Sequence, residues 1–292
     1  MSYLTLNNDG GFLSFDEQAC IAAGERLGDA YRGATPFPHA VIDDFLDPGL
    51  LRDIAKGYPS LENRPFFDRD QERFKYQIHP QESGNRLVKN LLAELNSQAF
   101  LGFLRALTGI EGLIADPYFL GGGLHETRRG GHLGVHADFN IHQGMKLERR
   151  LNLLIYLNED WQPEYGGDLE LWDTRMTRCE VKVSPVIGRA LIFNTALDSF
   201  HGHPEPLTCP EDRSRRSIAT YYYTAPEGGV GQLARRTTNF RQRPNSGDRF
   251  DWRISLSHWI RDWTPPAIQR WRGRWSRWTP GESFREDEGH RS

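Results

Sequence analysis

The segment Leu133–Phe139, LGVHADF, carries His136 and Asp138 two residues apart among small and apolar residues. Its length and composition predict a short β-strand. Side chains alternate between the two faces of a strand, so we expect His136 and Asp138 to point to the same face. A single strand would thus offer an imidazole and a carboxylate to one metal ion.

A second histidine pair follows in Ser199–His203, SFHGH, where His201 and His203 share one strand face. Either of them could join His136 and Asp138. Two histidines and one carboxylate on one face of a metal leave its other positions open, which is typical of non-heme Fe(II) oxygenases. The pattern of histidine and aspartate arises often by chance, so the prediction depends on the motifs around it.

Arg215, Arg216 and Ser217 open a further strand after this histidine pair. With a period of two, Arg215 and Ser217 lie on one face and Arg216 on the other. An arginine on the inner face can bind a carboxylate through two hydrogen bonds, and a hydroxyl can add a third. Both arginines stay candidates on parity alone.

The chain from about residue 113 to residue 224 consists of short apolar segments separated by Gly, Pro, Asn and Asp. The predicted strands are Leu133–Phe139, Leu151–Leu157, Asp168–Trp172, Cys179–Val183, Arg189–Phe193, Ser199–His203 and Ser217–Thr224. Seven strands at this spacing indicate a β-sandwich or barrel. With helices before and after it, the chain is predicted to be α+β, with a jelly-roll (double-stranded β-helix) core.

The first hundred residues predict mainly helices. Apolar residues at helical spacing follow Ser14, a predicted N-cap, over Phe15–Tyr31. A strand at His39–Leu46 precedes a short helix at Leu50–Lys56, and two more helices are predicted within Gly84–Leu107. These helices would form a layer that supports the β core.

Composition excludes several classes of protein. Hydrophobic residues make up 38% of the 292, and no apolar run approaches the roughly 20 residues that a membrane-spanning helix needs. The N-terminus, MSYLTLNNDGGF, lacks the basic and apolar regions of a secretory signal, which predicts a cytoplasmic protein without membrane insertion. Three distant cysteines form no CxxC pair, which argues against a zinc knuckle or a disulfide framework.

Charge and tryptophan are concentrated near the C-terminus. Residues 228–292 hold thirteen arginines and seven acids, or +6, which leaves −9 for the remainder of a chain of net charge −3. The tryptophans at helical spacing are Trp252, Trp259, Trp263, Trp271 and Trp275. We expect a main domain at 1–227, its β core at about 113–225, and a helical extension at 228–292 packed on the core or on a second subunit. Nucleic acid is disfavoured as a partner.

Several motifs in a fixed order resemble the Fe(II)/2-oxoglutarate dioxygenases of the prolyl 4-hydroxylase-like superfamily. They are HisAlaAsp at 136–138, TyrLeuAsn at 156–158, GGDLEL at 166–171, PVIGRALIF at 185–193, His201, and ArgArgSer at 215–217. PFPHAVIDDFL at 36–46 also resembles the entry segment of bacterial members. The resemblance covers roughly Pro36 to Tyr223.

The resemblance implies a role for each matching residue. The implied iron ligands are His136, Asp138 and His201, and the implied 2-oxoglutarate ligands are Arg215, Tyr156 and Ser217. It favours His201 over His203 because His201 follows an apolar strand residue as in relatives, and Arg215 over Arg216 because Arg215 and Ser217 fit the family's RxS pattern. Fe(II), 2-oxoglutarate and O2 would be required, with ascorbate as an optional reductant.

Polar residues that flank the iron strand predict a substrate rim, and its basic members favour a substrate with a carboxylate or phosphate. They are His125, Arg128, His132, Asn140 and His142. The expected reaction is hydroxylation of a C–H bond in an amino-acid-like, peptidyl or small natural-product substrate, with release of succinate and CO2. The alternative is a jelly-roll binding module with a structural or vestigial metal that acts through its basic tail. A homo-oligomer is compatible with either function.

Overall fold

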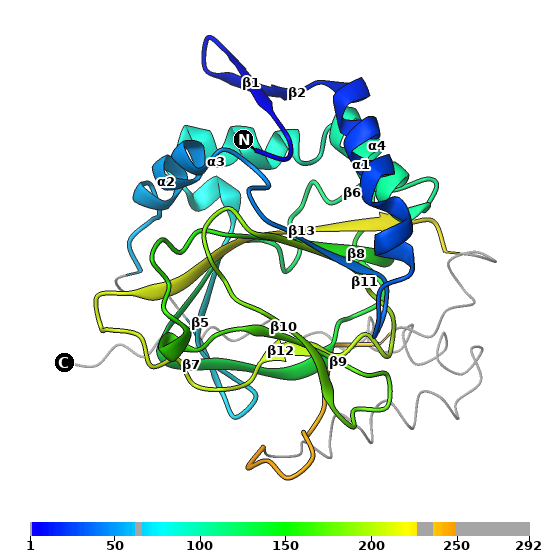
Figure 1. The fold of residues 1–292 in the computed structure, drawn as a ribbon. Helices are drawn as coiled ribbons and strands as arrows, with labels where there is room; N and C mark the ends of the chain where they lie inside the picture. Colours follow the sequence, from blue (N-terminus) through cyan, green and yellow to red (C-terminus); the bar gives the residue numbers. More distant parts are fainter. Residues whose placement is uncertain (1, 62–65, 227–235, 249–292) are drawn as a thin grey trace, which may run out of the picture.

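The computed structural model describes residues 2–61, 66–226 and 236–248 (Figure 1). The helices are α1 (Glu17–Arg32), α2 (Pro48–Lys56), α3 (Arg86–Glu94) and α4 (Gln98–Thr108), with short 3-10 turns at Pro80–Glu82 and Pro163–Tyr165. The strands are β1 (Leu6–Asp9), β2 (Phe12–Phe15), β3 (His39–Ile42), β4 (Phe67–Arg69), β5 (Glu72–Ile78), β6 (Ile114–Ala115), β7 (Gly123–Ala137), β8 (Glu148–Tyr156), β9 (Leu169–Trp172), β10 (Cys179–Val183), β11 (Ala190–Asn194), β12 (His201–His203), β13 (Ser214–Thr224) and β14 (Asn239–Phe240). Apart from the β1–β2 hairpin, these strands form one continuous sheet of mainly antiparallel pairs.

Strand β7 belongs to two layers of this sheet. Strand β13 pairs with residues 123–128 of β7 and β12 with residues 133–136, while β5 pairs with residues 124–133 and β14 with the last two residues. The partners change around Gly130 and Gly131. Gly130 has a φ of +74°, and a Cβ on Gly131 would lie 2.7 Å from the carbonyl oxygen of Arg73, so both positions require glycine.

The two layers face each other as in a jelly roll. The strand order β10-β9-β12-β7-β13-β8-β11-β3 runs from the smaller layer, through β7, into the larger one (Figure 1). Strand β11 is buried on both faces. Its Ala190 and Ile192 join the core under the helices, and Leu191 and Phe193 join the core between the layers. The predicted α+β fold with a jelly-roll core is confirmed.

The helices cover the outer face of the larger layer (Figure 1). Helix α1 packs closely on α4, because Gly24 of α1 has no side chain to hold the two backbones apart. A Cβ added to Gly24 would lie 2.4 Å from the carbonyl oxygen of Phe103 in α4. Phe100 and Phe103 of α4 then fill the core against Phe45.

The strand predictions differ from the structure mainly before residue 133. Strand β7 begins ten residues earlier than predicted, and the predicted helical half of the chain also contains β1, β2, β4 and β5. Helix α1 is capped by Asp16, which accepts from the backbone N–H of Ala19, so the predicted N-cap Ser14 is wrong. The predicted tryptophan helices of the extension lie outside the described residues.

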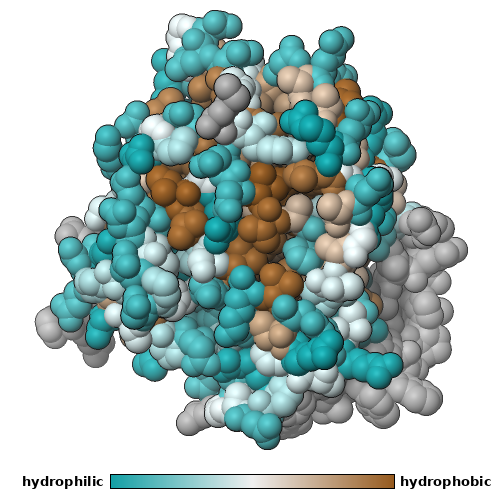
Figure 2. Space-filling view, in the orientation of Figure 1, coloured by the Kyte–Doolittle hydropathy of each residue, from teal (hydrophilic) through white to brown (hydrophobic). Residues whose placement is uncertain are grey.

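Apolar side chains gather across the middle of the face shown in Figure 2, between polar regions above and below. Val41 on the edge strand β3 is 41% exposed, so an apolar side chain reaches the surface at this edge of the larger layer. Among the described residues, no helix is long and apolar enough to cross a membrane.

We predict that Gly24→Ala destabilises the protein by about 1 to 3 kcal/mol, because the new methyl group collides with backbone rather than with a movable side chain. Gly84→Ala is the matched control, since a Cβ at Gly84 meets no atom within 4 Å. Urea unfolding of both variants measures the difference. Equal stability of the two variants would contradict the proposed close contact between α1 and α4.

Candidate active site

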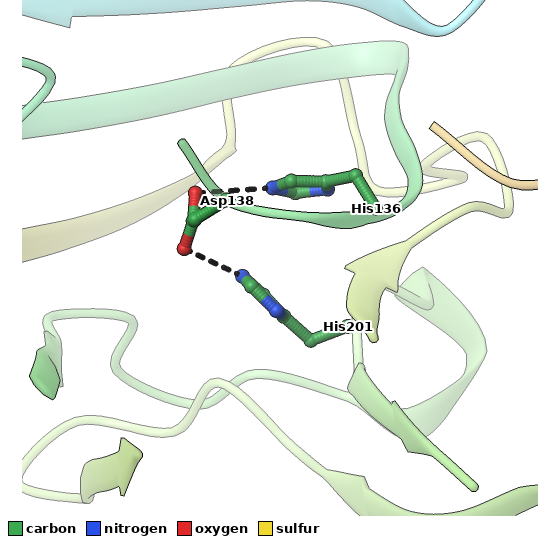
Figure 3. A group of neighbouring side chains, drawn as sticks. All are labelled: His136, Asp138 and His201. Atoms are coloured by element: carbon green, nitrogen blue, oxygen red, sulfur yellow. Dashed lines mark ion pairs between the residues drawn. The ribbon is translucent and has the colours of Figure 1, made fainter. Parts of the chain in front are cut away.

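His136, Asp138 and His201 converge on one point between the two layers (Figure 3). Their ligand atoms all lie within 4.8 Å of one another. The Nε2 atom of His136 lies 3.6 Å from Asp138 Oδ1, and the Nε2 atom of His201 lies 3.4 Å from Asp138 Oδ2. The sheet explains this meeting, because His201 on β12 is the direct cross-strand partner of His136 on β7.

Both imidazoles of this triad are held in one orientation by the backbone. The Nδ1 atom of His136 lies 2.9 Å from the carbonyl oxygen of Gly134, and that of His201 lies 2.9 Å from the carbonyl oxygen of Ser199. A carbonyl can only accept, so each Nδ1 carries the proton and each Nε2 presents a lone pair to the centre. Burial, with the nearby His136, lowers the pKa of His201 to about 4, which keeps that lone pair free at neutral pH.

Asp138 is held as a carboxylate by a buried arginine. Burial alone would raise the pKa of Asp138, but the Arg149 guanidinium, 3.2 Å from Oδ2, and the two histidines hold it well below its usual range. Asn152 donates a further hydrogen bond of 2.8 Å to Oδ2 and accepts two from Arg149. Arg149 also lies over the Tyr221 ring, 3.5 Å from its centroid. Two imidazoles with Nε2 toward the centre and one ionised carboxylate are a donor set that fits Fe(II).

The triad lines a cavity of about 290 Å³ whose far wall is built from aligned rows of side chains. Thr127 of β7 is paired with Arg215 of β13 on one side and with Lys75 of β5 on the other. The neighbouring row consists of Gln77, His125, Ser217 and Tyr156, which are cross-strand partners on β5, β7, β13 and β8. Residues in register across a sheet share a face, so both rows point inward together.

Arg215 faces this cavity without a carboxylate partner among the described residues. Only 5% of it is exposed, its Nε donates to the carbonyl oxygen of Gly167 at 2.7 Å, and its Nη2 has no hydrogen-bond partner. Burial lowers the pKa of its guanidinium. The Tyr156 hydroxyl is buried beside this guanidinium, and the Arg215 guanidinium carbon lies 5.0 Å from the centroid of the Tyr156 ring. A buried cation without a counter-ion fits an anionic ligand.

Arg216 points to the opposite side of the strand. Its Nε donates to Glu126 at 3.2 Å, and its guanidinium carbon lies 4.8 Å from the centroid of the Tyr58 ring. Of the two candidate arginines, the structure therefore places Arg215 with Ser217 in the cavity and gives Arg216 a structural ion pair. His203 also lines the cavity, and it lies outside the group of atoms close enough to share a metal with the triad.

The predicted rim residues are scattered. His125 lines the triad cavity, and Asn140 lines an adjoining cavity of about 950 Å³. Arg128 instead stacks over Tyr76, and His132 lies 3.1 Å from the carbonyl oxygen of Asp70. His142 is buried beside Asp116, with 3.5 Å between its Nε2 and Oδ1. The structure does not bring these last three to either cavity.

Two short segments outside the predicted β core also line the cavity. Hairpin β4–β5 contributes Lys75 and Gln77. The alternation of polar and apolar residues at 72–78 is the sequence pattern that could have predicted β5. Strand β14, within the predicted extension, pairs with the end of β7, and its Phe240 ring lies 5.2 Å from the His136 ring. No local pattern marks Asn239–Phe240 as a strand, so only the structure reveals this wall.

The cavity combines a metal triad with a buried arginine, and residues 122–223, which hold all of these groups, match the model of the 2OG-Fe(II) oxygenase superfamily. This part of the chain is therefore similar to the 2OG-Fe(II) oxygenases. The match begins just before β7 and ends within β13, so it contains both the triad and Arg215. Hairpin β4–β5 and β14, which complete the cavity, lie outside this match.

Known relatives are distant. The chain is 25% identical over 215 residues, 68% of its length, to prolyl 3-hydroxylase OGFOD1 of Mus musculus, and the match covers 37% of that protein. The structure superposes on a prolyl hydroxylase of Trichoplax adhaerens, solved with a hypoxia inducible factor peptide fragment, with a TM-score of 0.51 and 17% identity over 70% of this chain and 91% of that one. A Pseudomonas putida prolyl-4-hydroxylase superposes with a TM-score of 0.49 and is 18% identical. That match covers 70% of this chain and 100% of the other chain. The superposition on the Trichoplax adhaerens enzyme shows that this chain has the fold of that prolyl hydroxylase.

We predict that Arg149→Met destabilises the metal-free protein by about 3 to 5 kcal/mol, because it leaves Asp138 as a buried carboxylate without its cation. A divalent metal should recover part of this loss by restoring the missing positive charge. Arg150→Met is the matched control next in sequence, since Arg150 makes only a 3.3 Å contact with Thr224 and should change stability by less than about 1 kcal/mol. Urea unfolding with chelator and with Mn(II) tests this, and equal losses in the two variants would refute it.

Proposed function

We propose that this protein is an Fe(II)- and 2-oxoglutarate-dependent dioxygenase that hydroxylates a prolyl residue within a peptide or protein. The observation that carries the proposal is one cavity that holds both a His–Asp–His triad able to bind a metal and a buried arginine without a counter-ion among the described residues. A metal alone would not need the arginine, and a carboxylate ligand alone would not need the triad. A cosubstrate that binds metal at one end and carries a carboxylate at the other needs both.

The roles of the residues follow from their positions. His136, Asp138 and His201 hold Fe(II) and leave its other positions open. Arg215 binds the distal carboxylate of 2-oxoglutarate, with Ser217 and the Tyr156 hydroxyl as further hydrogen-bond partners. Bound iron with 2-oxoglutarate and O2 supplies the oxidising chemistry, which leaves succinate and CO2. Phe193 and Phe240 pack on His201 and His136 and exclude water from the triad.

The substrate class is proposed from the adjoining cavity and from the relatives. That cavity, of about 950 Å³, borders Asp138 and Arg149 and is larger than a free amino acid needs. Pro36, Phe37 and Phe200 give it apolar walls that suit a prolyl ring. OGFOD1 is a prolyl 3-hydroxylase, and the Trichoplax adhaerens enzyme was solved with a peptide, which supports a peptidyl substrate here as well. Ascorbate as reductant, a homo-oligomer and a cytoplasmic location stay predictions.

The direct test is turnover with Fe(II), 2-oxoglutarate and a library of proline-containing peptides. We expect succinate release coupled to the addition of one oxygen atom to a prolyl residue, measured by mass spectrometry. His136→Ala, Asp138→Ala and His201→Ala should abolish turnover and weaken Mn(II) binding at least about 100-fold, since each removes a ligand. His203→Ala should keep the affinity for Mn(II). Full turnover in His201→Ala with none in His203→Ala would overturn the ligand assignment.

We predict that Arg215→Met lowers the affinity for 2-oxoglutarate at least about tenfold, because a charge-assisted hydrogen bond contributes about 1.5 to 3 kcal/mol. Arg216→Met should leave this affinity unchanged. It should reduce stability instead, since it removes the ion-pair partner of the buried Glu126. Calorimetry of the Mn(II)-loaded variants separates the two effects. A greater loss of affinity in Arg216→Met would show that the strand register is shifted by one residue.

A further inference from the structure

His203 is a buried histidine without a hydrogen-bond partner for its Nδ1 atom among the described residues. It is 3% exposed, and its side chain lines the triad cavity. A second unpaired group that lines this cavity is the Nη2 atom of Arg215. Leaving a buried polar group unpaired is costly, so two such groups on one cavity indicate a ligand that pairs with both.

His203 lines the same cavity as the triad and Arg215. It follows His201 by two residues on β12, opposite Leu133 of β7. Strand β12 also pairs with β9, where Gly202 lies opposite Glu170. Gly167, three residues before Glu170, has the carbonyl that accepts from Arg215. Strand β12 thus connects the triad to the segment that holds Arg215, and His203 faces the cavity that both line.

The other cation of the cavity is already compensated. Lys75 forms a 2.7 Å ion pair with Glu72, and both side chains are nearly buried. Arg215 has no such partner among the described residues, so the negative charge of a ligand is expected at Arg215 rather than at Lys75. A hydrogen-bond donor next to that charge would come from His203, whose ring carries an N–H in either protonation state.

We propose that His203 is a specificity-determining residue that donates a hydrogen bond to the distal carboxylate of 2-oxoglutarate, beside Arg215. This inference rests on the proposed function. His203 thereby selects a 2-oxo acid with a second carboxylate over one that ends in a methyl group. The triad binds the other end of both acids, so His203 affects only the distinction between them.

The experiment compares two ligands on the Mn(II)-loaded full chain by calorimetry. They are 2-oxoglutarate and 2-oxopentanoate, which has the same chain length and a methyl group in place of the distal carboxylate. We expect His203→Leu to weaken 2-oxoglutarate binding at least about tenfold and to leave 2-oxopentanoate binding within about twofold of wild type. His203→Gln, which keeps an N–H donor, should recover most of the loss. His132→Leu, a histidine outside the cavity, is the control and should bind both acids as wild type does.

Three outcomes would overturn the inference. Unchanged binding of 2-oxoglutarate in His203→Leu would show that the imidazole does not contact it. An equal loss for both acids would show that His203 acts at the metal end or through the fold. A wild-type protein that binds Mn(II) but neither acid would refute the proposed function together with this role, which separates that failure from the first two. If His203→Leu does not fold, His203→Met is read by the same comparison.

Discussion

The active site depends on strand β7 being hydrogen-bonded into both layers of the jelly roll. Its first half carries Thr127 and His125 next to β13, where Arg215 and Ser217 lie, and its end carries His136 opposite His201 of β12. One continuous backbone therefore fixes the spacing between the triad and the arginine. Gly130 and Gly131, where the partners change, allow the backbones to approach closely at this point.

Charge in the interior is arranged in two contrasting ways. At the triad, the Asp138 carboxylate is matched by Arg149 and Asn152, so it stays ionised and in place before any metal arrives. At the other end, Arg215 has backbone support from Gly167 but no carboxylate among the described residues. A compensated anion suits a permanent metal ligand, whereas an uncompensated cation suits an anion that binds and leaves.

The cavity is completed by segments on both sides of the oxygenase match in the sequence. Hairpin β4–β5 adds Lys75 to the cross-strand row that contains Arg215, and Gln77 to the row that contains Ser217. Strand β14 places Phe240 against His136. These contacts make the segments before and after residues 122–223 part of the site. The domain boundary predicted at residue 227 marks a change in amino-acid composition. Strand β14 lies beyond that boundary and still pairs with β7.

The sequence by itself determined the residues whose signal is local. Alternation along single strands identified His136 with Asp138 and Arg215 with Ser217, and short strands between turns indicated a jelly roll. Only the tertiary structure decided which residues meet across strands. Arg215 faces the cavity whereas Arg216 does not, and Arg149 lies beside Asp138. Lys75 and His203 line the cavity, whereas His142 lies beside Asp116. The physical reason is that sheet pairing joins residues far apart in the chain, and a register cannot be deduced from either strand alone.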